Sequence, residues 1–236
     1  MTKLNKALSL IILIVLAVSC GKKNDANFTL KGKVKGLKKG IVYLQKDGDS
    51  SIVDLDSIVI AGQTEFELHT DLEEPMLLYL KLFKNDGKEH YIPFFADKGV
   101  TEISTTLKSF NYESEIKGSK QQELIEEYLS FITKFKDKNL DIIEASYMAQ
   151  KRNDSIALDS LNNLADLLIK RKYAYTIQFA MNNKDSEVAP YLALTQSNNI
   201  NPVYIDSIYN SLGTEIKNSL YGKKLNDAIT ARKSAE

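Results

Sequence analysis

The chain has 236 residues and no net charge, because 31 lysines and arginines balance 31 aspartates and glutamates. A chain with this balance lacks the positive field of nucleic-acid-binding proteins, so we expect no nucleic-acid partner. The hydrophobic content of 43% is enough for a sizeable core, which excludes a disordered chain. A single cysteine also excludes a fold held together by internal disulfides.

The N-terminus carries the pattern of an exported protein. Two lysines precede an apolar run over residues 7–18, and the only cysteine, Cys20, follows it closely. The run fits the apolar core of a secretory signal and is shorter than the ~20 residues of a membrane-spanning helix. With Cys20 it resembles a bacterial lipoprotein signal. We therefore expect a signal peptide over residues 1–19 and a lipidated tether over residues 20–27.

Lipidation of Cys20 would place the protein at a membrane. Each buried methylene contributes about 0.8 kcal/mol, and stable anchoring needs more than one chain, as a diacylglyceryl cysteine provides. We expect a cell-envelope protein anchored in the outer membrane and facing the periplasm, with the cell surface as the alternative. An ordinary cleaved signal with an incidental cysteine is the competing interpretation.

The first part of the mature chain, residues 28–118, has a β pattern. From Phe28 to Gly36, apolar residues and glycines alternate with polar residues, as in a strand with one buried face. Further strand-like runs follow at intervals of about 8–12 residues, separated by turn signals such as Asn85-Asp86-Gly87. The pattern predicts roughly seven to nine short strands in an antiparallel β-sandwich or a curled sheet.

The second part, residues 119–236, has a helical pattern, which makes the fold class α+β. Ser119 and Gln122 form a capping box before a first helix that extends to about Phe135. A long second helix is expected from about Leu140 to Met181. Three shorter helices are expected to begin near Ser186, Pro202 and Thr214, the last with a break near Gly222.

The apolar stripe of the first helix predicts how the two parts meet. We expect the sheet to pack against this helix through Leu124, Tyr128, Leu129 and Ile132, which follow one another at helical spacing.

Several short motifs of this chain resemble one known family. They include Gly36-Leu37 with Gly40, Phe94-Phe95-Ala96-Asp97-Lys98-Gly99, Asp185-Ser186 and Tyr221-Gly222-Lys223. In order and spacing they resemble a domain of unknown function in lipoproteins of Bacteroidota, where it precedes a thioredoxin-like or peroxiredoxin-like module. The resemblance implies an envelope protein related to thiol-disulfide oxidoreductases.

The redox motif of that module is not found in this sequence. The resemblance implies a Cys-x-x-Cys pair as the attacking and resolving thiols, whereas this chain has only Cys20 and ends at Glu236, near the expected start of the module. Thiol–disulfide exchange needs a thiolate, which a lipidated cysteine does not offer. We therefore expect a protein that is not an enzyme, with no catalytic residue and no cofactor.

A lysine stripe is the most distinctive charged feature. It comprises Lys31, Lys33, Lys35, Lys38 and Lys39, all on or beside the first expected strand. One interpretation is a solvated strand face that discourages edge pairing. The other is contact with anionic headgroups, at about 1 kcal/mol for each basic residue near the surface.

Metal and acyl-transfer chemistry receive little support from the sequence. His69 and His90, the only histidines, have no partner at helical spacing, so we expect strand-end side chains and no metal site. The aspartates of residues 47–56 lack the glycine and terminal glutamate of a calcium loop. Ser114 with Lys117 matches a serine acyl-enzyme motif only in spacing, so a hydrolase remains a minor alternative.

The leading hypothesis is a lipid-anchored envelope protein that binds or scaffolds a protein partner, such as a thioredoxin-like protein or an assembly factor. The runner-up is a lipoprotein that binds a small molecule or glycan between the sheet and the helices. A large exposed apolar patch would favour the first, and an apolar pocket with converging polar groups would favour the second.

Overall fold

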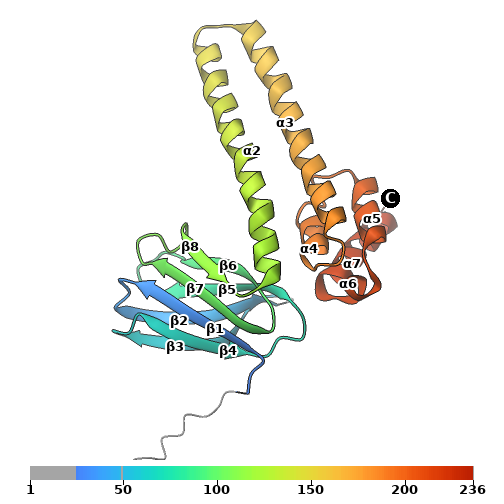
Figure 1. Cartoon of the computed structure of the whole chain (residues 1–236). Helices are drawn as coiled ribbons and strands as arrows, with labels where there is room; N and C mark the ends of the chain where they lie inside the picture. The colour runs from blue at the N-terminus through green and yellow to red at the C-terminus, as the bar shows by residue number, and fades with distance from the viewer. Residues whose placement is uncertain (1–24, 49, 236) are drawn as a thin grey trace, which may run out of the picture.

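The computed structural model describes residues 25–48 and 50–235. Its N-terminal part is a β-sandwich and its C-terminal part is helical (Figure 1), which confirms the α+β class. Eight strands are present in the described residues, within the expected range: β1 (Phe28–Lys35), β2 (Lys39–Asp47), β3 (Ile52–Ala61), β4 (Glu65–Thr70), β5 (Met76–Phe83), β6 (Tyr91–Ala96), β7 (Gly99–Thr106) and β8 (Ser114–Lys117).

The strands form two four-stranded sheets, in the orders β4-β1-β7-β8 and β3-β2-β5-β6. All pairs are antiparallel except β1 with β7, which run parallel from the Phe28–Gly99 pair onwards. The expected antiparallel sandwich is therefore confirmed with one parallel pair. A parallel pair requires a long crossover, and here the whole second sheet lies between the two strands in sequence.

The core of the sandwich lies between the two sheets and follows from the alternation of each strand. Phe28, Leu30 and Val34 of β1 are buried, while the lysines between them point to solvent. Gly32 takes the remaining inward position because a Cβ there would lie 2.1 Å from the ring of Phe66 on the neighbouring β4. The missing side chain thus makes room for a buried aromatic ring.

Six helices follow the sandwich in the described residues: α2 (Lys120–Lys151), α3 (Ser155–Asn182), α4 (Val188–Thr195), α5 (Pro202–Ser211), α6 (Thr214–Asn218) and α7 (Leu220–Ala235). Ser119 caps α2 as predicted, because its Oγ accepts a hydrogen bond from the backbone N–H of Gln122 at 3.3 Å. Asn201 likewise caps α5, with Pro202 in the first turn.

The predicted boundary between the first two long helices was wrong. α2 continues past Phe135 to Lys151, and α3 begins only at Ser155. Residues 136–139 are polar, and they lie within a continuous helix. The chain reverses at Asn153, which has a φ of 53°, and Asp154 then caps α3 through a hydrogen bond from the backbone N–H of Ala157.

The break that the sequence predicts near Gly222 is present in the structure. It falls at Ser219, between α6 and α7, whereas Gly222 lies inside α7. Gly222 allows close packing, because a Cβ there would lie 1.9 Å from the carbonyl oxygen of Ile216. In the part of the chain that the structure covers, no helix is long and apolar enough to cross a membrane.

Candidate functional site

The helices α2 and α3 form an antiparallel hairpin that rises from the sandwich (Figure 1), and we call this hairpin the arm. Its base is fixed to the sandwich by Gln122, a buried residue in the first turn of α2. The Oε1 atom of Gln122 accepts a hydrogen bond of 2.7 Å from the backbone N–H of Phe95 on β6. The edge strand β6 therefore sets the direction in which the arm leaves the sandwich.

The C-terminal helix α7 makes a second connection to the sandwich. The backbone N–H of Leu77 on β5 donates a 2.9 Å hydrogen bond to the hydroxyl oxygen of Tyr221, and burial raises the pKa of Tyr221 to about 12. The carboxylate of Glu74 accepts a 2.7 Å hydrogen bond from the backbone N–H of Leu220. A carboxylate at the first turn of a helix is also favoured by the helix dipole.

Aromatic packing joins the two helices of the arm near its base. Tyr128 and Phe131 of α2 both stack on Tyr175 of α3, with ring centroids 6.0 and 5.0 Å apart. The hydroxyl groups of Tyr128 and Thr176 are hydrogen-bonded at 2.9 Å, and both side chains are buried. This contact fixes the register between the helices, because a shift of one residue would separate the two hydroxyls.

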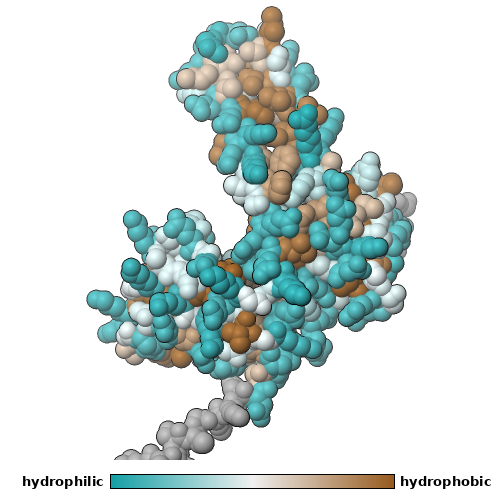
Figure 2. Space-filling model, viewed as in Figure 1, coloured by the Kyte–Doolittle hydropathy of each residue, from teal (hydrophilic) through white to brown (hydrophobic). Residues whose placement is uncertain are grey.

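Further from the sandwich, the arm is two helices thick and leaves many apolar side chains exposed (Figure 2). Ile142 and Ala149 are buried between the helices. The exposed apolar residues of this distal part are Leu140, Ile143, Tyr147, Met148, Ile156, Leu164, Leu167 and Ile169. Soluble monomers rarely leave large contiguous apolar patches uncovered, so exposed apolar patches mark interaction sites.

The predicted contact between the sheet and the first helix is correct in part. Tyr128 and Ile132 are buried beside Phe95 of β6, and Leu124 packs against the same cluster. The prediction for Leu129 was wrong, because this side chain is 47% exposed. Leu129 is not part of that cluster, so the buried stripe of α2 at the junction is narrower than the sequence suggests.

A groove lies beside the arm, between α3 and α5. Its volume is about 630 Å³, and Ile177, Ile200 and Met181 give it an apolar floor. Polar side chains also face it: Gln178, Asn182, Asn199, Tyr173, Tyr204 and Lys170. The three amides have no side-chain hydrogen-bond partner among the residues that the structure describes, so they are available to a ligand. The sequence placed a ligand between sheet and helices, whereas this groove lies within the helical part.

The structure places the lysine stripe on the outer face of β1, on the turn after it and at the first residue of β2. Lys33 pairs with Glu65 on β4 at 2.7 Å, and this hydrogen bond raises the pKa of the lysine and lowers that of the glutamate. Lys31 pairs with Glu67 at 3.6 Å. Lys35, Lys38 and Lys39 are also exposed. Two of the five charges are thus partly neutralised, and contact with an anionic surface stays a prediction.

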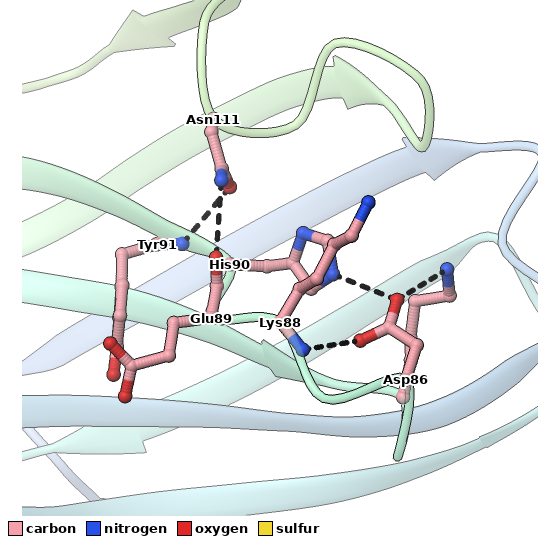
Figure 3. Close-up of polar contacts among 7 residues, drawn as sticks. Asp86, Lys88, Glu89, His90, Tyr91 and Asn111 are labelled. Atoms are coloured by element: carbon pink, nitrogen blue, oxygen red, sulfur yellow. Dashed lines mark hydrogen bonds and ion pairs between the residues drawn. The ribbon is translucent and has the colours of Figure 1, made fainter.

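The two histidines lie at different places on the sandwich. His90 Nε2 is 3.1 Å from Asp86 Oδ2 in the β5–β6 connection (Figure 3). Asp86 also accepts a hydrogen bond from the backbone N–H of Lys88, and these contacts hold its pKa well below the usual range. Asn111 closes this end of the sandwich by bonding the backbone of Glu89 and Tyr91. The arrangement stabilises a turn and brings no nucleophile to the histidine.

Two of the aspartates that might suggest calcium are held by protein groups. Asp54 accepts a 2.6 Å hydrogen bond from Gln45, and Asp56 accepts one of 2.7 Å from the backbone N–H of His69. Within residues 25–48 and 50–235, no three His, Cys, Asp or Glu side chains lie close enough to hold a metal ion. Cys20, with the predicted signal peptide and most of the tether, lies outside the described residues.

A comparison with protein families gives a match over the sandwich. Residues 28–125 match the model of a family described as a domain of unknown function (DUF4369). The match begins at the first residue of β1 and ends at Ile125, in the second turn of α2. It therefore covers the whole sandwich and the base of the arm. No curated protein matches the chain.

Proposed function

We propose that this protein is a lipid-anchored, non-catalytic envelope protein that holds a protein partner through the α2–α3 arm. The partner class is envelope redox or assembly machinery, such as a thioredoxin-like protein, in line with the resemblance to domains that precede thioredoxin-like modules. Tethering would raise the local concentration of the partner without new chemistry.

The observation that carries the proposal is the apolar surface of the arm. Leu140, Ile143 and Tyr147 are 63%, 55% and 56% exposed, on a helix pair that has no further layer against it in the described residues. A polar face would serve a monomer equally well, so the apolar residues are explained best by a protein surface that covers them.

The direction of the arm is also suited to a tethered protein. The first described residues leave the sandwich on the side opposite the hairpin turn (Figure 1). An anchor at Cys20 would therefore hold the sandwich near the membrane and direct the arm away from it. A helix as long as α2 extends about 48 Å, so the arm would reach well beyond the lipid headgroups.

A second candidate function, binding of a small molecule or glycan, is favoured by the α3–α5 groove. Its volume lies within the 300–1,000 Å³ typical of ligand sites, and amides and tyrosines are groups that bind sugars and other neutral polar ligands. Met181→Arg would fill the groove without disturbing the core, because Met181 is 40% exposed. An NMR binding screen of envelope oligosaccharides against the wild-type chain and the Met181→Arg variant tests this candidate.

Crosslinking and affinity capture from native membranes test the leading proposal. The wild-type chain should capture a reproducible envelope protein, and a variant with Ile143→Glu and Leu164→Glu should lose it. Val59→Glu on the sandwich is the matched control, since Val59 is 65% exposed and lies far from the arm in the fold. Equal capture by all three proteins would contradict a role for the arm.

A further inference from the structure

One side of the arm carries both a hollow and a ridge. The hollow has a volume of about 200 Å³ and is lined by residues of both helices: Phe135, Lys136, Asn139, Leu168, Ile169 and Lys172. The ridge consists of Leu140, Ile143 and Tyr147, all more than half exposed.

Helical spacing places the ridge and the hollow on the same side. Lys136, Leu140, Ile143 and Tyr147 follow one another at intervals of four, three and four residues, which is the spacing of a single helix face. Because Lys136 lines the hollow, the ridge continues from the hollow towards the hairpin turn. Leu129, two turns before Lys136, extends the same face towards the sandwich.

Charge differs between the two ends of this face. Lys136 and Lys172 border the hollow, whereas the ridge end carries Glu144 and one cation, Lys151, whose Nζ lies 4.6 Å from the ring centre of Tyr147. Among the described residues, neither Lys136 nor Glu144 forms an ion pair within the chain. Lys136 and Glu144 lie equally far in sequence from Leu140, one on each side. A two-fold axis near Leu140 would therefore bring each lysine close to the glutamate of another copy.

We propose that the partner on this face of the arm is a second copy of the chain. Two arms would pack antiparallel into a four-helix bundle, with the ridge of each copy in the hollow of the other. Such an isologous contact requires a surface that is complementary to itself, and this face meets the requirement in shape and in charge. The inference rests on the proposed role of the arm as a protein-binding surface and names its occupant.

The available area suits a dimer. The face from Leu129 to Lys151 is about 34 Å long and about 20 Å wide across two helices, which gives roughly 700 Å² per copy. Stable interfaces bury about 800 Å² on each partner. The other side of the arm, with Leu164 and Leu167, would remain free for a different protein.

Sedimentation velocity of the full chain, purified from membranes in density-matched detergent, tests the proposal. We expect a concentration-dependent dimer. Lys136→Glu should raise its dissociation constant ~10-fold or more, and the double variant Lys136→Glu/Glu144→Lys should restore dimerisation. Ile143→Glu should also give monomers, while Leu164→Glu, on the other side, should not. Circular dichroism melts establish that each variant is folded. A monomeric wild type, or a dimer unaffected by Lys136→Glu and Ile143→Glu, would overturn the proposal.

Disulfide crosslinking gives an independent geometric test. A cysteine at position 140 lies near the expected axis, so Leu140→Cys should form a covalent dimer in membranes on oxidation, and Leu164→Cys should form far less. Equal crosslinking at both positions would overturn the antiparallel arrangement. A monomeric chain that still captures another envelope protein through the arm would refute the second copy and leave the proposed function intact.

Discussion

Tyr221 connects α7 to the sandwich through one hydroxyl group. Tyr221→Phe keeps the ring in its aromatic cluster with Phe95 and Tyr191 but removes the acceptor for the Leu77 N–H. An unsatisfied buried donor costs about 1–3 kcal/mol, so we expect the free energy of unfolding to fall by about that amount. Urea denaturation measures the change. Tyr112→Phe is the control, because Tyr112 is 87% exposed, and an equal effect at both sites would contradict this role.

Glu187 carries a charge at a partly buried position between α3 and α4. Burial raises its pKa above 4.5, and Asp97, Glu74 and Glu215 add repulsion. Glu187 therefore binds a proton more readily in the folded state than in the unfolded state. The contribution of this group to the free energy of unfolding is lost as the pH rises through its folded pKa.

We accordingly expect Glu187→Gln to raise the melting temperature at pH 7. Glutamine can still accept the 2.7 Å hydrogen bond from Gln121 but carries no charge. The gain should shrink as the pH falls towards 4.5, where the native glutamate is also protonated in the folded state. Thermal melts from pH 4 to pH 8 measure this, with the exposed Glu113→Gln as the control. A gain that is independent of pH would show that charge is not the cause.

Cys20 lies outside the described residues, and its lipidation stays a prediction from sequence. If it is correct, the wild-type chain partitions into the detergent phase, and Cys20→Ala shifts the chain into the soluble fraction or blocks cleavage of the signal. Phase partitioning followed by intact-mass spectrometry measures both outcomes. An unmodified Cys20 in the mature protein would contradict the anchor.

At the scale of single elements, α2 changes its environment along its length. Ile132 is 8% exposed in the cluster beside Phe95, whereas Leu129, one turn earlier, is 47% exposed. We expect Ile132→Ala to cost about 2–5 kcal/mol of unfolding free energy and Leu129→Ala only a few tenths. Chemical denaturation of both variants measures the difference. A large loss at Leu129 in the monomer would mean that this side chain is covered within the chain.

Most strands could be predicted from sequence because they have one buried face, as the alternation of β1 shows. The parallel pairing of β1 with β7 could not, since alternation reports which side of a strand is buried and does not report its neighbour. The hairpin turn was missed because Arg152, Asn153 and Asp154 contain neither glycine nor proline. The signals present were an Asn able to adopt a positive φ and an Asp able to cap the next helix.

At the scale of the whole molecule, the candidate sites arise from contacts between distant segments. The groove needs Ile177 of α3 beside Ile200, which precedes α5, and the hollow needs Phe135 of α2 beside Leu168 of α3. Ile143, Tyr147 and Leu164 lie within the long helix that the sequence predicts from about Leu140 to Met181. The sequence could not indicate that the arm is too thin to bury them, because burial depends on how many layers pack against a helix.

The central claim is that the arm binds protein, and site-specific photocrosslinking in cells tests it most directly. A photoreactive phenylalanine analogue at Tyr147, on the arm, is compared with the same analogue at Tyr112, which is more exposed and lies on the sandwich. We predict a discrete protein adduct from position 147, either with a second copy or with another envelope protein, and none from position 112. No adduct at position 147, or the same adducts at both positions, would contradict the claim.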